Sequence, residues 1–167
     1  MIFLTVGTMY TYDRLLKIVD NAISKGIITD QVFGQIGNTN YKPQNFEYVK
    51  TLSRDKYIKC FTKADAIISH AGIGTIIMAL ECNKSLLVVP RLSKFNEHVN
   101  DHQVGTSQAF FKKGALLVAN DEAEFVKVFP SLETFRSSYV GHQRENLVQF
   151  LREKIYLPKF QFGSASR

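Results

Sequence analysis

Short apolar segments alternate with amphipathic segments along most of this chain, and the alternation constrains the fold more than any other feature. Six runs rich in Val, Ile, Leu and Phe are bounded by Gly, Pro, Asn or charged residues, a pattern that predicts strands. The expected strands are Met1–Val6, Gln31–Ile36, Phe46–Val49, Asp65–Ser69, Ser85–Pro90 and Ala115–Ala119.

Segments with helical periodicity separate these strands. Between residues 13 and 24 the apolar side chains recur at helical spacing, and Gly26 follows as a stop signal. The expected helices are Asp13–Ser24, Lys56–Lys63, Gly74–Cys82, His102–Lys113, Glu122–Phe129 and a last one near Ser137–Lys154. This order predicts an α/β fold, namely a Rossmann-like parallel sheet with helices on both faces. The 167 residues suit one domain, residues 1–160, followed by a polar tail at 161–167.

One strand-to-helix turn, His70-Ala-Gly-Ile-Gly-Thr75, indicates a ligand site. Two glycines let the main chain turn tightly and come close to a ligand. Free amides at a helix start favour an anion, and Thr75 can cap the helix or donate its hydroxyl to that anion. A plain tight turn also fits the pattern, and the third glycine of the dinucleotide fingerprint is missing. The loops after Val6, Ser69 and Pro90 all reach the carboxyl edge of the predicted sheet, where ligands bind in such folds, which favours a phosphorylated small molecule.

Charge and composition exclude several classes of protein. The formal net charge of +6 suits a phosphorylated ligand, an anionic membrane surface or nucleic acid. No block of five like charges occurs and aromatic residues do not alternate with basic ones, which argues against nucleic acid. Cys60 and Cys82 lack metal-ligand spacing, and we expect neither a metal nor a cofactor. No apolar run approaches the ~18 residues of a spanning helix, and Met1–Val6 lacks the basic leader of a signal peptide, so we expect a reduced, cytoplasmic setting.

Four motifs then occur in a fixed order along the chain. They are Thr5-Val-Gly-Thr8, Gln35-Ile-Gly-Asn38 with Tyr41 and Pro43, Ile68-Ser-His-Ala-Gly-Ile-Gly-Thr75, and Val88-Val-Pro-Arg91 with Glu97-His-Val-Asn-Asp-His-Gln103. Over about residues 1–120 the set resembles the carboxyl-terminal domain of glycosyltransferase family 28. It is most similar to the stand-alone catalytic subunits of two-component transferases, which include bacterial capsule and exopolysaccharide enzymes.

The resemblance implies a half-enzyme, the carboxyl-terminal half of a GT-B fold. This half would bind a UDP-sugar donor, while a separate membrane-anchored subunit binds a lipid-linked acceptor and supplies the general base. The implied activity is that of an inverting hexosyltransferase, with galactose as the first candidate sugar, in capsule or exopolysaccharide biosynthesis. The protein would then lie at the inner face of the cell membrane, held there by its partner. A non-catalytic, nucleotide-sugar-binding or regulatory subunit is the alternative.

The resemblance also assigns donor-binding residues, and none of them is a catalytic base. They are Gly7, Thr8, His70, Gly72, Gly74, Thr75, Arg91, Asp101, His102 and Gln103. The glycine-bearing turn at 72–75 would hold the diphosphate, and Gly7 with Thr8 would form a second turn facing the same place. Fixed amides there would stabilise the negative charge that grows on the leaving diphosphate.

Some of these residues have a second interpretation. His70 would donate to a phosphate oxygen or simply pack in its loop, and Arg91 and Lys94 would add positive charge or belong to a solvated loop. His102 and Gln103 would bind hydroxyls of the donor sugar or lie exposed in a first helical turn. Asp101 would be the N-cap of that helix or a further hydroxyl acceptor.

Two residues depart from the family pattern. Met78 stands where the family usually has a glutamate that binds the ribose hydroxyls, and a thioether accepts such bonds poorly. Glu81, three residues later, is a candidate substitute, whereas Gly105 replaces an acidic residue that is common after the His-Gln pair. The aromatic stretch Ile155–Phe162 is a candidate docking element for the partner, or packs on the domain itself.

Overall fold

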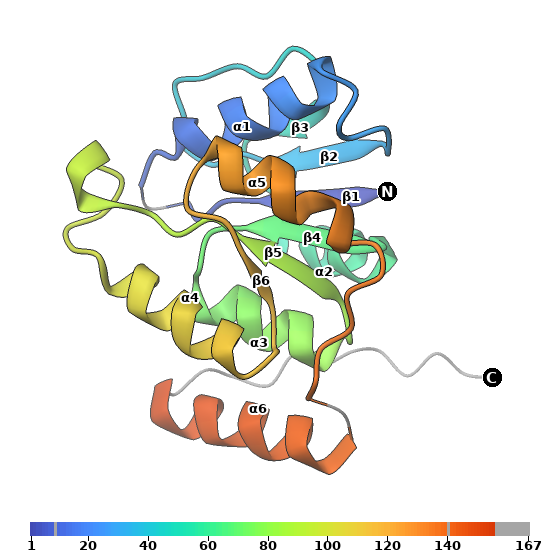
Figure 1. Ribbon diagram of the computed structural model, residues 1–167, viewed down its shortest axis with the longest axis vertical. Helices are drawn as coiled ribbons and strands as arrows, with labels where there is room; N and C mark the ends of the chain where they lie inside the picture. Colours follow the sequence, from blue (N-terminus) through green and yellow to red (C-terminus); the bar gives the residue numbers. More distant parts are fainter. Residues whose placement is uncertain (9, 140, 156–167) are drawn as a thin grey trace.

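Six parallel strands form one sheet in the order β3-β2-β1-β4-β5-β6 (Figure 1). The computed structural model describes residues 1–8, 10–139 and 141–155. The strands are β1 (Ile2–Thr5), β2 (Val32–Gln35), β3 (Glu47–Val49), β4 (Ala66–Ser69), β5 (Ser85–Val88) and β6 (Leu117–Val118). Leu4 in the middle of β1 lies opposite Gly34 of β2 and Ile68 of β4.

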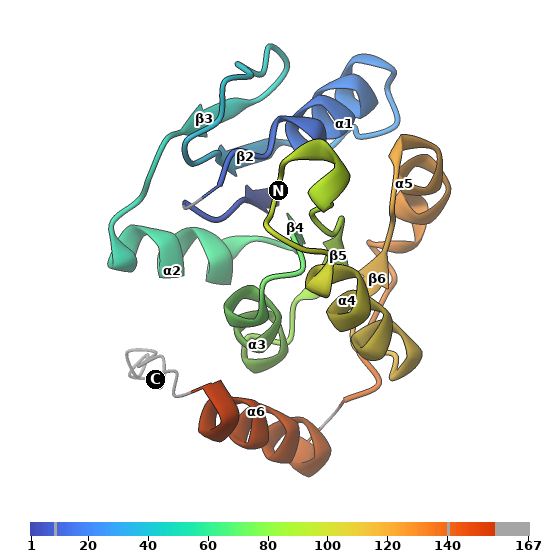
Figure 2. The ribbon, with the colours of Figure 1, turned by 90° about the vertical axis from the view of Figure 1, so that its left-hand side faces the viewer.

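Helices cover both faces of this sheet. They are α1 (Asp13–Ser24), α2 (Arg54–Lys63), α3 (Ile73–Glu81), α4 (His102–Lys112), α5 (Glu122–Val128) and α6 (Gly141–Ile155), with the short 3-10 helices η1 (Ser93–Phe95) and η2 (Phe129–Ser131). Helices α1 and α5 share a hydrophobic core with one face of the sheet, and α2, α3 and α4 share a second core with the other. Helix α6 packs on the outer side of α3 and adds a further layer (Figure 2).

The central strands are buried on both faces, which explains why they are continuous apolar runs in the sequence. Side chains alternate between the two cores, because a strand has a period of two residues. Phe3 and Ile67 point into the core shared with α2 and α3, whereas Leu4 and Ile68 point into the core shared with α1. This double burial fixes the register of β1 against β4 and therefore the position of the turns that follow them.

The order of the strands places a topological switch point between β1 and β4. From β1 the chain runs outward to β2 and β3 on one side, then returns to β4 and continues to β5 and β6 on the other. The loops after β1 and β4 therefore lead to helices on opposite faces of the sheet. Open α/β sheets bind their ligands at such a topological switch point. The fold thus places the turns after Thr5 and Ser69 at the expected location for a ligand.

The predicted α/β fold class is confirmed, and the boundaries of several elements differ from expectation for local reasons. Helix α3 begins at Ile73 instead of Gly74, because Gly72 takes the N-cap position. Helix α5 ends at Val128, because proline cannot donate to the helical ladder and Pro130 directs the chain into η2. The last helix begins at Gly141 and not near residue 137. The amide of Ser138 bonds instead to the Gly114 carbonyl at 2.8 Å.

The end of the chain is only partly described. The predicted tail at 161–167 lies outside the described residues, as does the candidate docking stretch 155–162 apart from Ile155. Within the described part of the chain, no helix combines the length and the apolar character that crossing a bilayer requires.

Candidate functional site

Three turns meet at the carboxyl ends of the central strands. Gly7 follows β1, His70 follows β4 and Arg91 follows β5. A β-carbon placed on Gly7 would lie 3.4 Å from Nε2 of the His70 ring and 3.7 Å from Nη1 of Arg91. Three residues that the sequence assigned to one donor site are therefore in contact distance, although they are far apart in the chain.

The turn after β1 is supported by the turn after β2. Gly37 has a φ angle of +61°, and a β-carbon on it would come within 2.7 Å of the Gly7 carbonyl oxygen, so only glycine fits there. Thr8 is exposed beside this contact, and its carbonyl accepts a hydrogen bond from Nδ2 of Asn38 at 3.2 Å. The segment after β1 therefore lies beside His70, with Thr8 exposed, and its contact with a donor stays a prediction.

The two glycines at the start of α3 have different structural roles. Gly72 is the N-cap residue, and a β-carbon on it would lie only 2.4 Å from Nε2 of His70, so the ring requires glycine at this position. Gly74 meets no other atom within 4 Å of the place where its β-carbon would stand. Nothing in the packing of the domain requires a glycine at 74. Its effect is to leave the start of α3 uncovered, where the amides of Ile73 and Gly74 have no carbonyl one turn earlier in the helix to bond.

Thr75 does not cap α3, so the predicted capping role is wrong. Gly72 occupies the N-cap position without a side-chain bond, and the amides of Thr75 and Ile76 both bond to the Gly72 carbonyl at 3.1 Å. The Thr75 hydroxyl instead interacts with the phenol of Tyr57, whose pKa is raised by burial. Tyr57 also receives a bond from the Thr5 hydroxyl at 3.4 Å. Binding of an anion by Thr75 stays a prediction.

The hydrogen bonds of His70 fix which ring nitrogen carries its proton. The Ser69 hydroxyl donates to the Thr5 carbonyl at 2.6 Å, so at 3.2 Å it can only accept from Nδ1 of His70. This network assigns the neutral ring with hydrogen on Nδ1 and a lone pair on Nε2. Burial and the neighbouring Arg91 lower the pKa of His70 to about 3. The hydrogen bonds within the protein therefore leave His70 with an acceptor at Nε2, and donation by His70 to a phosphate oxygen stays a prediction.

Arg91 is a buried cation, so the solvated-loop interpretation is wrong for this residue. It is only 3% exposed, its Nη2 donates to the Tyr10 carbonyl at 3.1 Å, and its Nε has no hydrogen-bond partner. The guanidinium lies against the rings of Tyr10 and Tyr12, and burial lowers its pKa. No carboxylate of the described chain forms an ion pair with it. Lys94, by contrast, is exposed and fits the solvated loop.

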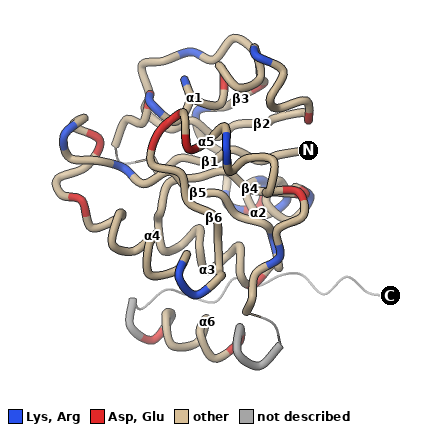
Figure 3. The backbone as a smooth tube through the Cα atoms, in the orientation of Figure 1, with Lys and Arg blue, Asp and Glu red and all other residues tan. Residues whose placement is uncertain are grey.

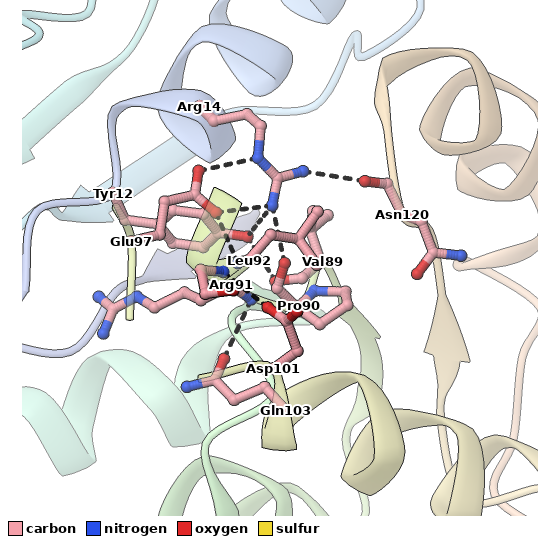
Figure 4. A network of polar contacts seen from close by, with 11 residues as sticks. Tyr12, Arg14, Val89, Pro90, Arg91, Leu92, Glu97, Asp101, Gln103 and Asn120 are labelled. Atoms are coloured by element: carbon pink, nitrogen blue, oxygen red, sulfur yellow. Dashed lines mark hydrogen bonds and ion pairs between the residues drawn. The ribbon is translucent and has the colours of Figure 1, made fainter. Parts of the chain in front are cut away.

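Glu97, the acidic residue nearest to Arg91 in the sequence, pairs with Arg14 instead. Glu97 forms a two-pronged ion pair with Arg14 of α1, with Nε to Oε1 at 2.8 Å and Nη2 to Oε2 at 2.9 Å (Figure 4). Arg14 also donates to the carbonyls of Pro90 and Asn120, and Glu97 accepts from the Leu92 amide. This network ties the loop after β5 to α1. Other Lys and Arg residues are spread over many elements (Figure 3). Arg91 differs from a surface cation because it is buried at the strand ends.

The remaining predicted residues lie at the start of α4. Asp101 is the N-cap residue of α4, but its carboxylate accepts from the Ser93 amide at 2.6 Å and makes no cap bond. Gln103 is buried, and its Oε1 accepts from the main-chain amide of Arg91 at 3.2 Å, so the exposed-turn interpretation is wrong for it. His102 is exposed, with its ring centre 4.5 Å from that of His98. Sequence reasoning missed the Gln103 contact, which no spacing rule reveals.

The two departures from the family pattern have clear structural settings. Met78 is only 1% exposed and belongs to the core beneath α3. Glu81 is the last residue of α3, ~10 Å along the helix from Gly74, so it does not lie at the helix start. A β-carbon on Gly105 would meet no atom within 4 Å. No group of three His, Cys, Asp or Glu side chains in the described segments is arranged to hold a metal ion.

The features described above lie together at one edge of the sheet. A Rossmann-type strand order brings a bare helix start, two glycine turns and an unpaired buried guanidinium to the switch point of the sheet. Main-chain amides and an arginine fork are the groups that bind phosphates. Such an arrangement is typical of Rossmann-type domains that bind phosphorylated ligands such as nucleotides.

The family follows from comparison with known proteins. The chain belongs to the glycosyltransferase family 28 C-terminal domain family, which matches residues 1–137. The UDP-N-acetylglucosamine transferase subunit ALG13 of Cryptococcus neoformans is 40% identical over 77 residues, which are 45% of this chain and 36% of that protein. The human ALG13 subunit is 32% identical over 125 residues, 69% of this chain and 10% of that protein. The chain thus spans about a third of the fungal relative and a tenth of the human one.

Solved structures show the same fold at low sequence identity. An NMR solution structure of ALG13 has a TM-score of 0.61 at 18% identity, covering 93% of this chain and 96% of that one. MurG of Acinetobacter baumannii has a TM-score of 0.59 at 17% identity, covering 90% of this chain and 49% of that one. The chain therefore matches about half of MurG, in agreement with the predicted GT-B half.

Proposed function

We propose that this chain is the donor-binding half of a glycosyltransferase that transfers a sugar from a UDP-sugar to a lipid-linked acceptor. The observation that supports this most strongly is the buried guanidinium of Arg91, which lacks a carboxylate partner in the described chain and lies beside Gly7 and His70. An unpaired buried charge is costly for a fold, and its retention is explained if a diphosphate neutralises it.

The geometry supports a direct role in transfer chemistry. When the sugar–phosphate bond breaks, its electron pair stays with the diphosphate, whose negative charge grows. Arg91 and the first-turn amides of α3 are fixed in place by the sheet, so they stabilise that charge without reorganising. Gly74 leaves room for a phosphate to approach those amides.

The acceptor half belongs to a separate protein in this proposal. The names of the relatives describe them as subunits of a UDP-N-acetylglucosamine transferase, and this chain matches only about half of MurG. A membrane-anchored partner would bind the lipid-linked acceptor and supply the general base that inversion requires. The chain would then lie at the inner face of the membrane through that partner.

The identity of the donor sugar is a finer part of the proposal. A role in capsule or exopolysaccharide synthesis rests on the resemblance of the four motifs together to bacterial two-component enzymes, with galactose as the first candidate sugar. The names of the curated relatives instead favour N-acetylglucosamine. Both UDP-sugars therefore belong in the test.

A second candidate function is a subunit that binds nucleotide-sugar without catalysis. The buried Met78 favours it, because a core methionine replaces the carboxylate that would accept the ribose hydroxyls. Glu81 stands at the far end of α3 and does not restore that carboxylate at the helix start.

Titration calorimetry with UDP, UDP-galactose and UDP-N-acetylglucosamine tests the binding half of the proposal. We expect a Kd below ~1 mM, equivalent to about 4 kcal/mol. Co-expression with the candidate membrane subunit, followed by an assay for labelled sugar on a lipid carrier, tests transfer. Binding without transfer in the assembled complex supports the second function, and the absence of binding by any uridine nucleotide refutes both.

A further inference from the structure

We propose that His70 takes up a proton when the donor diphosphate binds, and that its imidazolium then donates from Nε2 to a phosphate oxygen. This inference rests on the proposed function and adds a protonation step at one named atom. It concerns the charge state of the site, which family membership does not specify.

The contacts within the protein hold His70 in a form that cannot donate from Nε2 to a phosphate. Its Nδ1 hydrogen is used by Ser69, whose own hydroxyl hydrogen is used by the Thr5 carbonyl. Both partners lie in the central strands β1 and β4, so this arrangement does not relax easily. The Nε2 edge of the ring lies against Gly7 and Gly72, at the start of α3. An Nε2 lone pair directed there repels a phosphate oxygen unless a proton is added.

The groups around His70 explain why the proton is absent before the ligand binds. The charged and titratable groups that act on the ring are Arg91, from the end of β5, and His98, from the loop that follows. Helix α3 contributes the main chain of Gly72 at the contact, and β1 contributes the Thr5 carbonyl. Part of the ring surface stays open and protein atoms crowd the rest, so burial and the positive Arg91 lower the pKa to about 3.

A bound diphosphate reverses this balance. It brings at least two negative charges beside a site whose fixed cation is the single charge of Arg91, so the positive form of His70 becomes favoured. The proton comes from solvent or buffer and forms the Nε2–H bond, and it returns to solvent when the ligand leaves. As the sugar–phosphate bond breaks, the charge on the diphosphate increases further. The imidazolium therefore binds the transition state more tightly than the substrate, which is the condition for catalysis.

Calorimetry in buffers of different ionisation enthalpy measures this proton directly. UDP-N-acetylglucosamine and UDP-galactose are the probes, because their diphosphates lack the terminal phosphate group that titrates near pH 6. We expect uptake of about one proton per ligand near pH 6. The pH dependence of the affinity follows from a pKa of His70 that rises on binding. The affinity is highest at low pH and weakens by up to about tenfold per pH unit, until the pH passes the pKa of His70 in the complex. His70→Gln should abolish both the uptake and this slope.

A matched variant and a spectroscopic measurement identify the group that takes up the proton. His98→Gln changes the histidine that acts on the His70 ring and should leave the uptake at about one proton. Imidazole ¹⁵N NMR of the intact protein should show hydrogen on Nδ1 alone without ligand and on both nitrogens with it, which does not depend on any variant folding. UDP-sugar binding without proton uptake, or with Nε2 of His70 unprotonated in the complex, overturns this inference and leaves the proposed function standing. Absence of binding overturns both.

Discussion

Replacing Arg91 with methionine should weaken the binding of UDP while leaving the stability of the fold unchanged or higher. Arg91→Met keeps an unbranched apolar stem but removes the charged guanidinium from a position that is 3% exposed. A residue kept for folding loses stability when it is truncated, whereas a residue kept for a ligand loses affinity while the fold is spared or gains. The buried guanidinium makes this test sharp, because its charge has no carboxylate partner in the described chain.

The contacts of Arg91 give the expected magnitudes. The bond to the Tyr10 carbonyl contributes about 2 kcal/mol, and the two tyrosine rings about 1 kcal/mol each. Against these stands a desolvation penalty of several kcal/mol for one ion. The free energy of unfolding should therefore stay within ~2 kcal/mol of the parent, unchanged or higher, with a Tm shift of no more than about 6 °C. Loss of charge-assisted bonds to a diphosphate should cost about 3 kcal/mol, roughly a hundredfold in Kd.

Thermal denaturation and UDP titration of the same preparations measure both quantities. Lys94→Met is the matched control, since Lys94 lies three residues away and is exposed. It should change neither Tm nor Kd by more than about 2 °C or threefold. The reasoning is refuted if Arg91→Met lowers Tm by ~10 °C or more while the affinity for UDP stays within threefold of the parent.

Three further results are expected. Glu97→Gln breaks the two-pronged pair with Arg14 and should lower stability by about 3 kcal/mol, whereas adding Arg14→Met should recover part of that loss in denaturant titrations, because no buried charge is then left unpaired. Gly74→Ala should keep or raise Tm, because alanine gains up to ~1 kcal/mol in a helix and its methyl group meets no neighbour. The same methyl group should weaken UDP binding by about tenfold or more, because it keeps a phosphate from approaching the main chain. Unchanged binding would show that the phosphate does not lie there. Burial of Asp20 opposes ionisation, but hydrogen bonds from neighbouring groups outweigh it and lower its pKa, so its stabilisation is present above the unfolded pKa and is lost as pH falls through the folded value. Asp20→Asn should remove that acid-sensitive part of a Tm profile between pH 2 and 7.

Local chemistry made the elements predictable from the sequence. Helix α1 begins and ends where expected, because its apolar residues recur at helical spacing and Gly26 has a φ of +70° just beyond it. The strands were found because burial on both faces demands continuous apolar runs. The last helix was misplaced at its start, because the bond from Ser138 to Gly114 joins segments that no local pattern relates.

The candidate site was predictable in its location but not in its charges. Parallel strands bring their carboxyl ends to one edge, so the convergence of Gly7, His70 and Arg91 followed from the α/β pattern. The pairing of Arg14 with Glu97 did not, because it joins α1 to a loop beyond β5. Only that pairing shows that Glu97 forms its ion pair with Arg14 and not with Arg91. The protonation of the His70 ring likewise depends on a neighbouring hydroxyl, whose orientation no sequence pattern specifies.

The central position of β1 and β4 has a consequence for how the site withstands change. Two strands flank this pair on either side, and its side chains fill both cores. The last residues of these two strands can be displaced only by an opening that breaks the interior of the domain. Amide hydrogens near Thr5 and Ser69 should accordingly exchange with solvent only through global unfolding. The geometry around the strand ends should therefore persist in every variant whose domain still folds.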